Sequence, residues 1–247
     1  VTAHMIMRSF SGFVDRYIVI SKKLEHIAVH DWHLPKASIR FIPTTVDIDE
    51  LYKPSHAASE GFRLFYGGSF GEKDGLFTFL KAYKKVKIQF PEARFRLAGK
   101  ANPKSMKVLN DALISLDLVD SVELIGYLSR KEYVTEMNSA TVHCMTRIDS
   151  EYANAGFPFK LAEMLATKKP TVCSSLNSIT ELLDSSEVIF VAPDHEEELA
   201  DAVIDLFANP LKSAEVGRNG RLACERLFSA DHINIQQVLS ELIHERA

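Results

Sequence analysis

The sequence predicts an α/β fold built on a doubly wound parallel sheet. From residue 63 onward, short runs of consecutive apolar residues recur, and each is followed by a longer stretch with helical character. Runs that are apolar at successive positions indicate strands buried on both faces, which is typical of parallel sheets covered by helices. Right-handed crossovers between such strands give a Rossmann-like domain.

Before this regular region the chain reads as strand, helix and strand. Residues 15–21 form a β-branched run, and Ser21 is placed to cap the helix that follows. A second short strand is expected at residues 39–42. Residues 44–58 are polar, turn-rich and without periodicity, and are therefore predicted to form a linker.

The regular region is expected to alternate strands with helices and to end in helices. The predicted strands are residues 63–66, 95–98, 122–125, 141–145, 171–173 and 188–191. The predicted helices are residues 76–89, 104–116, 130–138, 160–167, 179–183, 196–208, 211–227 and 230–245. In such a sheet the ligand site lies beyond the carboxyl ends of the strands, at the switch in strand order.

Bulk composition argues against several classes of function. The 247 residues carry a formal charge of −4, so no basic excess favours nucleic-acid binding. No apolar run approaches the roughly 20 residues that span a bilayer, and no signal peptide opens the chain, so we expect a cytoplasmic protein. The cysteines and histidines show no disulfide or metal-site spacing. Cys144 and Cys173 lie in apolar runs and are predicted to be buried thiols.

Glycines and a lysine follow the first strand of the regular region. Gly67 and Gly68 would let the backbone approach a ligand closely, and the next helix start offers free N–H groups. Lys73 adds a positive charge suited to a diphosphate. The spacing matches neither GxGxxG nor a Walker P-loop, which argues against NAD binding and NTP hydrolysis. A tight turn with a solvated lysine explains this loop equally well.

A second candidate segment, GFPFKLAEMLATKKPTV, covers residues 156–172. Lys160 and Glu163 lie three residues apart, so they share one face at the start of a helix. A carboxylate there could accept two hydroxyl hydrogen bonds from a ribose, while free N–H groups face phosphate. On these residues alone, a surface Lys–Glu pair on an ordinary helix is the better explanation.

Taken in order, these segments resemble glycosyltransferase family 4, whose members have two Rossmann-like domains facing a cleft, the GT-B arrangement. The segment IRFIPTTVD is similar to the family's I-x-V-I-P-N-G-V-D, and GFPFKLAEMLATKKPTV is similar to EGFGLPVLEAMACGTPVV. Six segments match in order and at family spacing: residues 15–21, 39–47, 64–75, 95–100, 122–127 and 156–172.

The resemblance implies a chain of two parts. Residues 1–47 would hold the last strand and helix of an acceptor-side domain plus the interdomain segment, and residues 48–247 the domain that binds the donor nucleotide sugar. The rest of the acceptor-side domain is expected upstream of Val1, and this chain alone is expected to bind nucleotide with little or no transfer. Peripheral membrane contact at the cytoplasmic face would involve that upstream domain.

The implied activity is retaining transfer of a sugar from a UDP- or GDP-linked donor to a glycan or lipid-linked acceptor, as in polysaccharide biosynthesis, without a cofactor. Lys73 would hold the diphosphate, Glu163 the ribose hydroxyls, and the backbone at Tyr127 and Leu128 the base. N–H groups around Lys160 and Leu161 would meet the phosphates. The complete implied donor site is Gly67, Gly68, Lys73, Lys100, Tyr127, Leu128, Gly156, Phe157, Lys160, Leu161 and Glu163.

Two positions depart from the family pattern. Ala155 stands where the first glutamate of Glu-x7-Glu is expected, and Gly68 stands where an arginine is expected. Some family branches carry a GFP-x-K-L-x-E-Y version without the first glutamate, and this sequence resembles them. Our hypothesis is that Lys160 supplies the missing phosphate charge. The alternatives are a nucleotide-sugar epimerase of the same fold and a non-catalytic nucleotide-sugar-binding module. Arg147 follows a predicted strand at the binding edge, where a solvated loop is expected.

Overall fold

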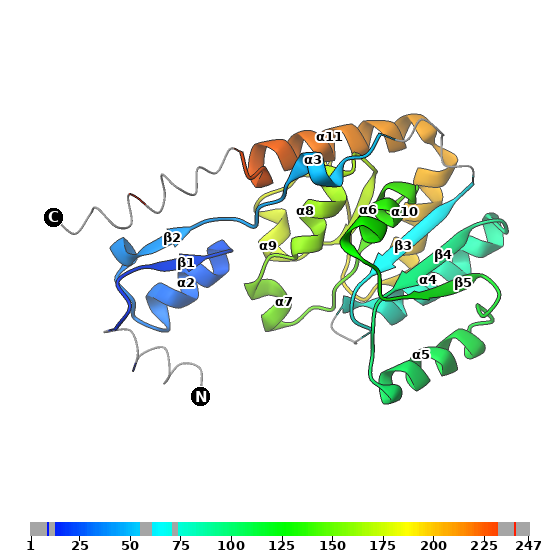
Figure 1. The fold of residues 1–247 in the computed structure, drawn as a ribbon, viewed down its shortest axis with the longest axis horizontal. Helices are drawn as coiled ribbons and strands as arrows, with labels where there is room; N and C mark the ends of the chain where they lie inside the picture. Colours follow the sequence, from blue (N-terminus) through cyan, green and yellow to red (C-terminus); the bar gives the residue numbers. More distant parts are fainter. Residues whose placement is uncertain (1–8, 10–12, 55–60, 71–73, 232–239, 241–247) are drawn as a thin grey trace.

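A small N-terminal part and a larger α/β body make up the fold (Figure 1). The computed structural model describes residues 9, 13–54, 61–70, 74–231 and 240. The small part consists of β1 (Tyr17–Val19), α2 (Lys22–His30), the 3-10 turn η2 (Lys36–Ser38) and β2 (Ile39–Phe41). The two strands pair in parallel. As predicted, Ser21 caps α2, because its Oγ accepts a hydrogen bond from the Leu24 N–H at 3.0 Å.

The chain enters the body beside the end of its last described helix, α11 (Pro210–Phe228). The Val46 N–H donates to the Phe228 carbonyl at 2.8 Å. The predicted linker is not fully irregular, since it contains the short helix α3 (Ile48–Leu51). Asp47 caps α3 by accepting the Glu50 N–H at 2.8 Å. Four residues are about one helical turn, too few to show the periodicity that reveals longer helices.

The body is built on parallel strands in two ladders that meet at one bridge. The strands are β3 (Arg63–Gly67), β4 (Arg94–Ala98), β5 (Val122–Gly126), β6 (His143–Met145), β7 (Thr171–Ser174) and β8 (Ile189–Val191). The ladders run β3-β4-β5 and β6-β7-β8, and the parallel bridge Leu64↔Val142 joins them. Counted from β3, the spatial order is therefore 3-2-1-4-5-6, which is the doubly wound order. Its direction reverses between β3 and β6.

Helices cover both faces of this sheet, as the predicted fold class requires (Figure 1). They are α4 (Leu76–Gln89), α5 (Pro103–Ser115), α6 (Arg130–Ser139), α7 (Glu151–Ala155), α8 (Phe159–Ala166), α9 (Asn177–Thr180), α10 (Glu196–Ala208) and α11. Apolar residues of α4, α5 and α10 form one core with the sheet. Those of α6, α8 and α11 form the second. Leu64 and Tyr66 enter the first core and Phe65 the second, because neighbours in a strand face opposite sides.

Most predicted elements are confirmed, and the differences are local. Helices α4 and α10 have the predicted bounds. β6 is shorter than predicted because Thr141 lies before the ladder, where its Oγ1 accepts the Arg63 N–H at 3.1 Å. α9 begins earlier and ends sooner than predicted, and turns follow it. Of the helix predicted at residues 230–245, only residues 230, 231 and 240 are described.

The described residues include three buried cysteines, and they show neither a membrane-spanning helix nor a cluster of metal ligands. Cys144 and Cys173 are buried as predicted, and Cys224 is buried as well. Burial raises the pKa of all three thiols. Within the described ranges, no helix is long and apolar enough to cross a membrane. Among the same residues, no group of three or more His, Cys, Asp or Glu side chains could hold a metal ion.

Candidate functional site

A cavity of about 530 Å³ lies at the carboxyl ends of β3 and β4, where the strand order reverses. Seven of the predicted site residues line it: Gly67, Gly68, Lys100, Tyr127, Leu128, Lys160 and Glu163. Five further residues complete the wall: Ser69, Ala98, Gly99, Arg130 and Tyr133. Residues predicted from four separate segments therefore meet at one site.

The loop after β3 is held in place by hydrogen bonds on both sides. The Gly68 N–H donates to the Ala98 carbonyl at 2.9 Å. The Tyr66 hydroxyl donates to the Ser69 carbonyl at 2.6 Å, and the Ser69 hydroxyl donates to the Asp74 carboxylate at 2.8 Å. The two glycines therefore present backbone rather than side chains to the cavity. Lys73, the predicted diphosphate ligand of this loop, lies outside the described residues.

Glycine is required where the loops after β3 and β4 touch. A Cβ on Gly99 would overlap the carbonyl oxygen of Gly68. A backbone atom fixed in a hydrogen-bonded loop cannot move aside without cost, so a larger residue at position 99 would force the two loops apart. The Gly99 N–H also donates to the Gly126 carbonyl at 2.8 Å, which ties the loop after β5 to the same floor.

Lys160 extends from the first turn of α8 across the cavity wall to Gly68. Its Nζ lies 5.2 Å from the centre of the Tyr66 ring. A Cβ on Gly68 would overlap this Nζ and lie 3.3 Å from Cε of the same lysine. The ammonium thus occupies the space that a side chain at position 68 would fill.

Glu163 is held from both of its carboxylate oxygens. Arg130 donates from Nη1 to Oε1 at 2.6 Å, and the Tyr133 hydroxyl donates to Oε2 at 3.1 Å. Arg130 also makes a two-pronged contact with Glu50, from Nε to Oε1 at 2.8 Å and from Nη2 to Oε2 at 3.1 Å. Arg130 and Tyr133 line the same cavity as Glu163, whose side chain is 17% exposed.

These contacts also fix the charges in the site. The hydrogen bond from Arg130 lowers the pKa of Glu50, and the bonds to Glu50 and Glu163 raise the pKa of Arg130. Burial, followed by the nearby Glu163 charge, raises the pKa of Tyr133. At neutral pH the site therefore contains a cationic Arg130 and a neutral Tyr133 hydroxyl.

Tyr127 forms an aromatic surface at the mouth of the cavity. Its side chain is 72% exposed, and Nζ of Lys100 lies 4.5 Å from its ring centre. A lysine at this distance attracts the electron-rich face of the ring. Such an exposed ring beside a cation is suited to stacking against a planar, polar group.

Three predicted residues lie outside the cavity lining. Phe157 and Leu161 are buried in the second core, and Phe157 packs against Phe228 at a ring distance of 5.0 Å. The Leu161 N–H, predicted to meet phosphate, donates to the Pro158 carbonyl at 3.0 Å. Gly156 ends α7 and is not among the lining residues. Phe157 and Leu161 help to position α8 through packing, since α8 must bury its apolar face.

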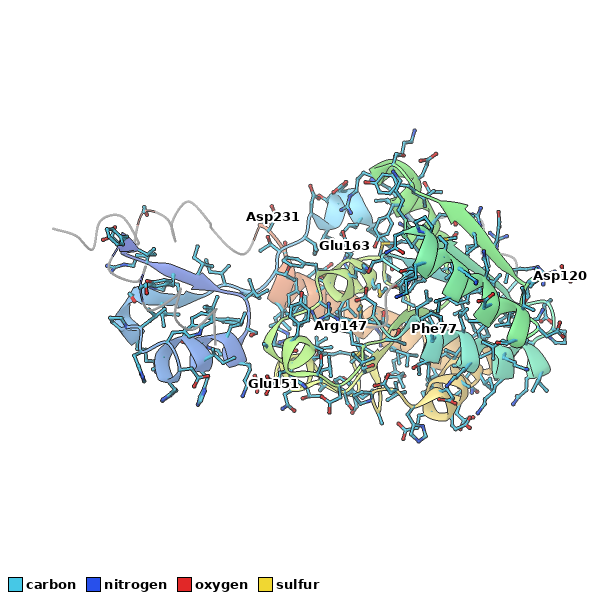
Figure 2. The ribbon with its side chains drawn as sticks, turned by 90° about the horizontal axis from the view of Figure 1, so that it is seen from below. Phe77, Asp120, Arg147, Glu151, Glu163 and Asp231 are labelled. Atoms are coloured by element: carbon cyan, nitrogen blue, oxygen red, sulfur yellow. The ribbon has the colours of Figure 1, made fainter. Side chains whose placement is uncertain are left out.

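The loop after β6 contributes no residue to the lining of this cavity. Arg147 is half-buried, which differs from the solvated loop that we expected. Its backbone N–H donates to Ser174 Oγ at 3.0 Å. Glu151 is exposed and begins α7, the helix that faces the small N-terminal part in both views (Figures 1 and 2). Ala155, at the end of α7, accepts a hydrogen bond from the Ser21 hydroxyl.

A second cavity, of about 560 Å³, lies at the other end of β3, β4 and β5, near Asp120 (Figure 2). It contains Arg94 and Arg96, and Arg96 pairs with Glu123 at 2.9 Å. None of the predicted site residues lines it. Because parallel α/β sheets bind ligands at the carboxyl ends of their strands, the cavity at the strand switch is the functional candidate.

Sequence reasoning missed Glu50, Arg130 and Tyr133. Arg130 and Tyr133 are three residues apart at the start of a predicted helix, so their shared face was available as a signal. Which element that face would meet depends on the tertiary arrangement. Glu50 lies in a segment predicted to be irregular, and nothing in its neighbours indicates a partner 80 positions away.

Comparison with known proteins places this geometry in context. A family profile described as glycosyl transferases group 1 matches residues 47–223. A phosphatidyl-myo-inositol mannosyltransferase from Mycobacterium leprae (strain TN) is 25% identical over 173 residues, covering 68% of this chain and 44% of that protein. The amylovoran biosynthesis glycosyltransferase AmsK from Erwinia amylovora is 26% identical over 136 residues, covering 54% and 32%. The chain thus spans less than half the length of these relatives.

Solved structures share the fold. Anabaena Alr3699/HepE in complex with UDP and glucose superimposes with a TM-score of 0.82 at 16% identity, covering 98% of this chain and 67% of that one. Sucrose-phosphate synthase from Thermosynechococcus elongatus gives a TM-score of 0.80 at 20% identity, covering 98% and 62%. The predicted fold class is confirmed.

Proposed function

Because the chain belongs to the glycosyl transferases group 1 family, we propose that it forms the donor side of a retaining hexosyltransferase. The donor would be a nucleotide diphosphate sugar and the acceptor a glycan or a lipid-linked molecule. One observation carries the proposal. A lysine and a glutamate on one face of α8 line a single cavity at the strand switch, where α/β folds bind nucleotides.

Each portion of the donor has a matching part of the cavity wall. The diphosphate would lie against the backbone of Gly67 and Gly68 beside the Lys160 ammonium. The ribose hydroxyls would bind the Glu163 carboxylate, and the base would lie near Tyr127. UDP is the first nucleotide to test, because the similar HepE structure contains UDP; GDP is the second.

Lys160 compensates for the glycine at position 68 in this proposal. The family pattern places an arginine there, whereas here the ammonium of Lys160 fills the space above Gly68. A positive charge would therefore reach the same part of the cavity from α8 instead of from the loop after β3. Ala155 stands where the family pattern has its first glutamate, so this proposal assigns no contact with the donor sugar to that position.

The chemistry that this site would support is stabilisation of the leaving group. The bond between the sugar C1 and the diphosphate oxygen breaks while the acceptor oxygen bonds to C1 on the same face. The acceptor proton passes to the departing phosphate, so no protein base is needed. Lys160 would stabilise the charge that develops on the diphosphate, and the ribose contact would hold the donor in place.

Nucleotide binding tests the proposal directly. UDP and GDP are titrated against the chain by calorimetry and thermal shift, together with Lys160→Ala and Glu163→Gln. We expect either substitution to weaken binding about tenfold or more, since hydrogen bonds to charged groups contribute about 1.5–3 kcal/mol. Ligand that binds the folded state also raises its melting temperature.

Matched substitutions elsewhere serve as controls. Lys131 is an exposed lysine on α6 and Glu215 an exposed glutamate on α11, and neither lines the cavity. Lys131→Ala and Glu215→Gln should bind as the unmodified chain does. If no nucleoside diphosphate binds at millimolar concentration, or if the controls weaken binding as much as the site variants, the donor-site assignment is wrong.

A further inference from the structure

We infer that Arg130 and Tyr133 are positioning residues, which hold the Glu163 carboxylate in the orientation that accepts the ribose hydroxyls. The inference rests on the proposed nucleotide site and adds a cause for its selectivity toward ribose. Neither residue belongs to the segments that carry the family resemblance at Glu163. Both come from the start of α6, and each contacts a different oxygen of the carboxylate.

The two contacts orient the carboxylate without blocking it. An ionised carboxylate has about four acceptor positions, two on each oxygen. Among the described residues, Arg130 uses one position on Oε1 and Tyr133 one on Oε2, so their contacts leave one acceptor position on each oxygen for a ligand. Two neighbouring hydroxyls, as on a ribose, present donors with matching separation, and each can reach a different oxygen.

Arg130 is itself held by an element fixed to the body. Its guanidinium contacts both oxygens of Glu50, a geometry that restricts rotation of the arginine. Glu50 lies in α3, whose Leu51 is fully buried. The Leu51 carbonyl accepts a hydrogen bond from Asn138 Nδ2 at 2.8 Å, so α3 is tied to α6. The orientation of Glu163 thus depends on a chain of contacts that begins in the segment entering the body.

Tyr133 reaches Glu163 because position 67 has no side chain. A Cβ on Gly67 would overlap the Tyr133 ring. The ring also packs against Phe65 at a centre distance of 5.7 Å. Gly67 therefore does more than let a ligand approach the backbone. It also leaves space for the Tyr133 ring to lie over β3 with its hydroxyl at the Glu163 carboxylate.

The exposure of the Arg130 and Glu50 side chains indicates that their contact positions Glu163 more than it stabilises the fold. The Arg130 and Glu50 side chains are 47% and 43% exposed, so their pairing is well screened by solvent and adds little to folding stability. A glutamate side chain that is held in place before the ligand binds loses less conformational freedom on binding than a mobile one does. Removing Arg130 should therefore change ligand selectivity more than it changes the melting temperature.

The test compares UDP with 2′-deoxy-UDP, which lacks one of the two ribose hydroxyls. Calorimetric Kd values are measured for the unmodified chain and for Arg130→Ala, Arg130→Lys, Tyr133→Phe and Glu163→Gln. The unmodified chain should prefer UDP by about tenfold, the effect of one hydrogen bond to a charged group. Arg130→Ala and Tyr133→Phe should reduce this preference to about threefold or less while the Kd for 2′-deoxy-UDP changes less than about twofold. Arg130→Lys should restore part of the preference, because it keeps the charge.

The control is Arg226→Ala, which removes an exposed arginine paired with Glu187 away from the cavity. It should leave the preference unchanged. If UDP binds with the expected preference and both Arg130→Ala and Tyr133→Phe retain it, the positioning role is refuted while the donor site stands. If the unmodified chain binds neither nucleotide, the proposed function fails and this inference with it. Should Arg130→Ala not fold, Tyr133→Phe, which removes a single hydroxyl, decides the question.

Discussion

Replacing Gly68 by alanine would test whether Lys160 carries the phosphate charge in this cavity. The new Cβ would overlap the Lys160 ammonium, with Cε at 3.3 Å and the Tyr66 hydroxyl oxygen at 3.2 Å. Gly68 is not among the described glycines with positive φ, so alanine can adopt its backbone conformation. The part that must move is the end of a flexible side chain. The substitution therefore displaces the ammonium and leaves the loop intact.

Gly68→Ala should affect both the affinity for UDP and the free energy of unfolding. A hydrogen bond to a charged group contributes about 1.5–3 kcal/mol, and Lys160 is only half-buried, so we expect a loss near the lower figure. This corresponds to about tenfold weaker UDP binding. A glycine-to-alanine change at a compatible backbone position stabilises by about 0.4–1 kcal/mol through the unfolded chain. Affinity should fall while the free energy of unfolding stays the same or rises slightly.

A double-mutant cycle isolates the coupling. UDP affinity is measured by calorimetry for the unmodified chain, Gly68→Ala, Lys160→Ala and the double variant, and urea unfolding is measured for each. In the Lys160→Ala background Gly68→Ala should have no further effect, which gives a coupling energy of about 1.5 kcal/mol. Gly156→Ala is the matched control, because its nearest new neighbour would be the Tyr152 carbonyl oxygen at 3.8 Å.

Two results would refute this reasoning. Gly68→Ala could bind UDP as tightly as the unmodified chain, which would mean that the ammonium does not act from its position above Gly68. Alternatively, the two substitutions could weaken binding additively, which would mean that Gly68 contributes through its own backbone contact with the ligand and not through Lys160.

Three further predictions concern the floor, the mouth and the core of the fold. Tyr127→Ala should weaken UDP about tenfold and leave inorganic pyrophosphate binding unchanged, since base–aromatic stacking contributes about 1–3 kcal/mol; equal losses for both ligands in calorimetry would contradict a base contact. Gly99→Ala should lower the free energy of unfolding in urea by about 1–3 kcal/mol, because its Cβ overlaps the Gly68 carbonyl; an unchanged urea midpoint would show that the loops can separate. His143 is fully buried, and desolvation lowers its pKa to about 3, whereas an unfolded histidine titrates near 6.5. The unfolded chain therefore binds one more proton below pH 6.5, and stability should fall by about 1.4 kcal/mol per pH unit from this group as the pH drops toward 3. Urea titrations between pH 5 and 6.5 should show that slope reduced in His143→Gln, and an unreduced slope would mean that other groups cause it.

The strands and long helices could be predicted because their pattern is local. Leu64, Phe65 and Tyr66 are apolar in succession, and the structure places them alternately in the two cores. Ser21 was predicted as a helix cap from its position alone. Helix α3 was missed because its stability comes from buried Leu51 and from Asn138, neither of which leaves a periodic signal in four residues.

The sequence predicted only those parts of the site that lie in segments following the ends of strands. Lys100, Tyr127 and Lys160 lie in different segments, and the strand order brings them to one cavity. The sequence did not predict the side-chain contacts between segments. The contact between Lys160 and Gly68 depends on the rotation of α8 relative to β3, and the Arg130–Glu50 pair depends on how the incoming chain packs over α6.

Helix α8 connects the proposed ligand site to the packing of the core. Leu161 and Leu165 are fully buried in the second core, and their packing fixes the rotation of the helix about its axis. Lys160 and Glu163 are three residues apart on the opposite side, so the same packing directs both into the cavity. A shift of one residue would rotate the helix by about 100° and replace the charged pair with apolar side chains. The large energy of core burial therefore determines the position of two polar groups whose own contacts are too weak to orient a helix.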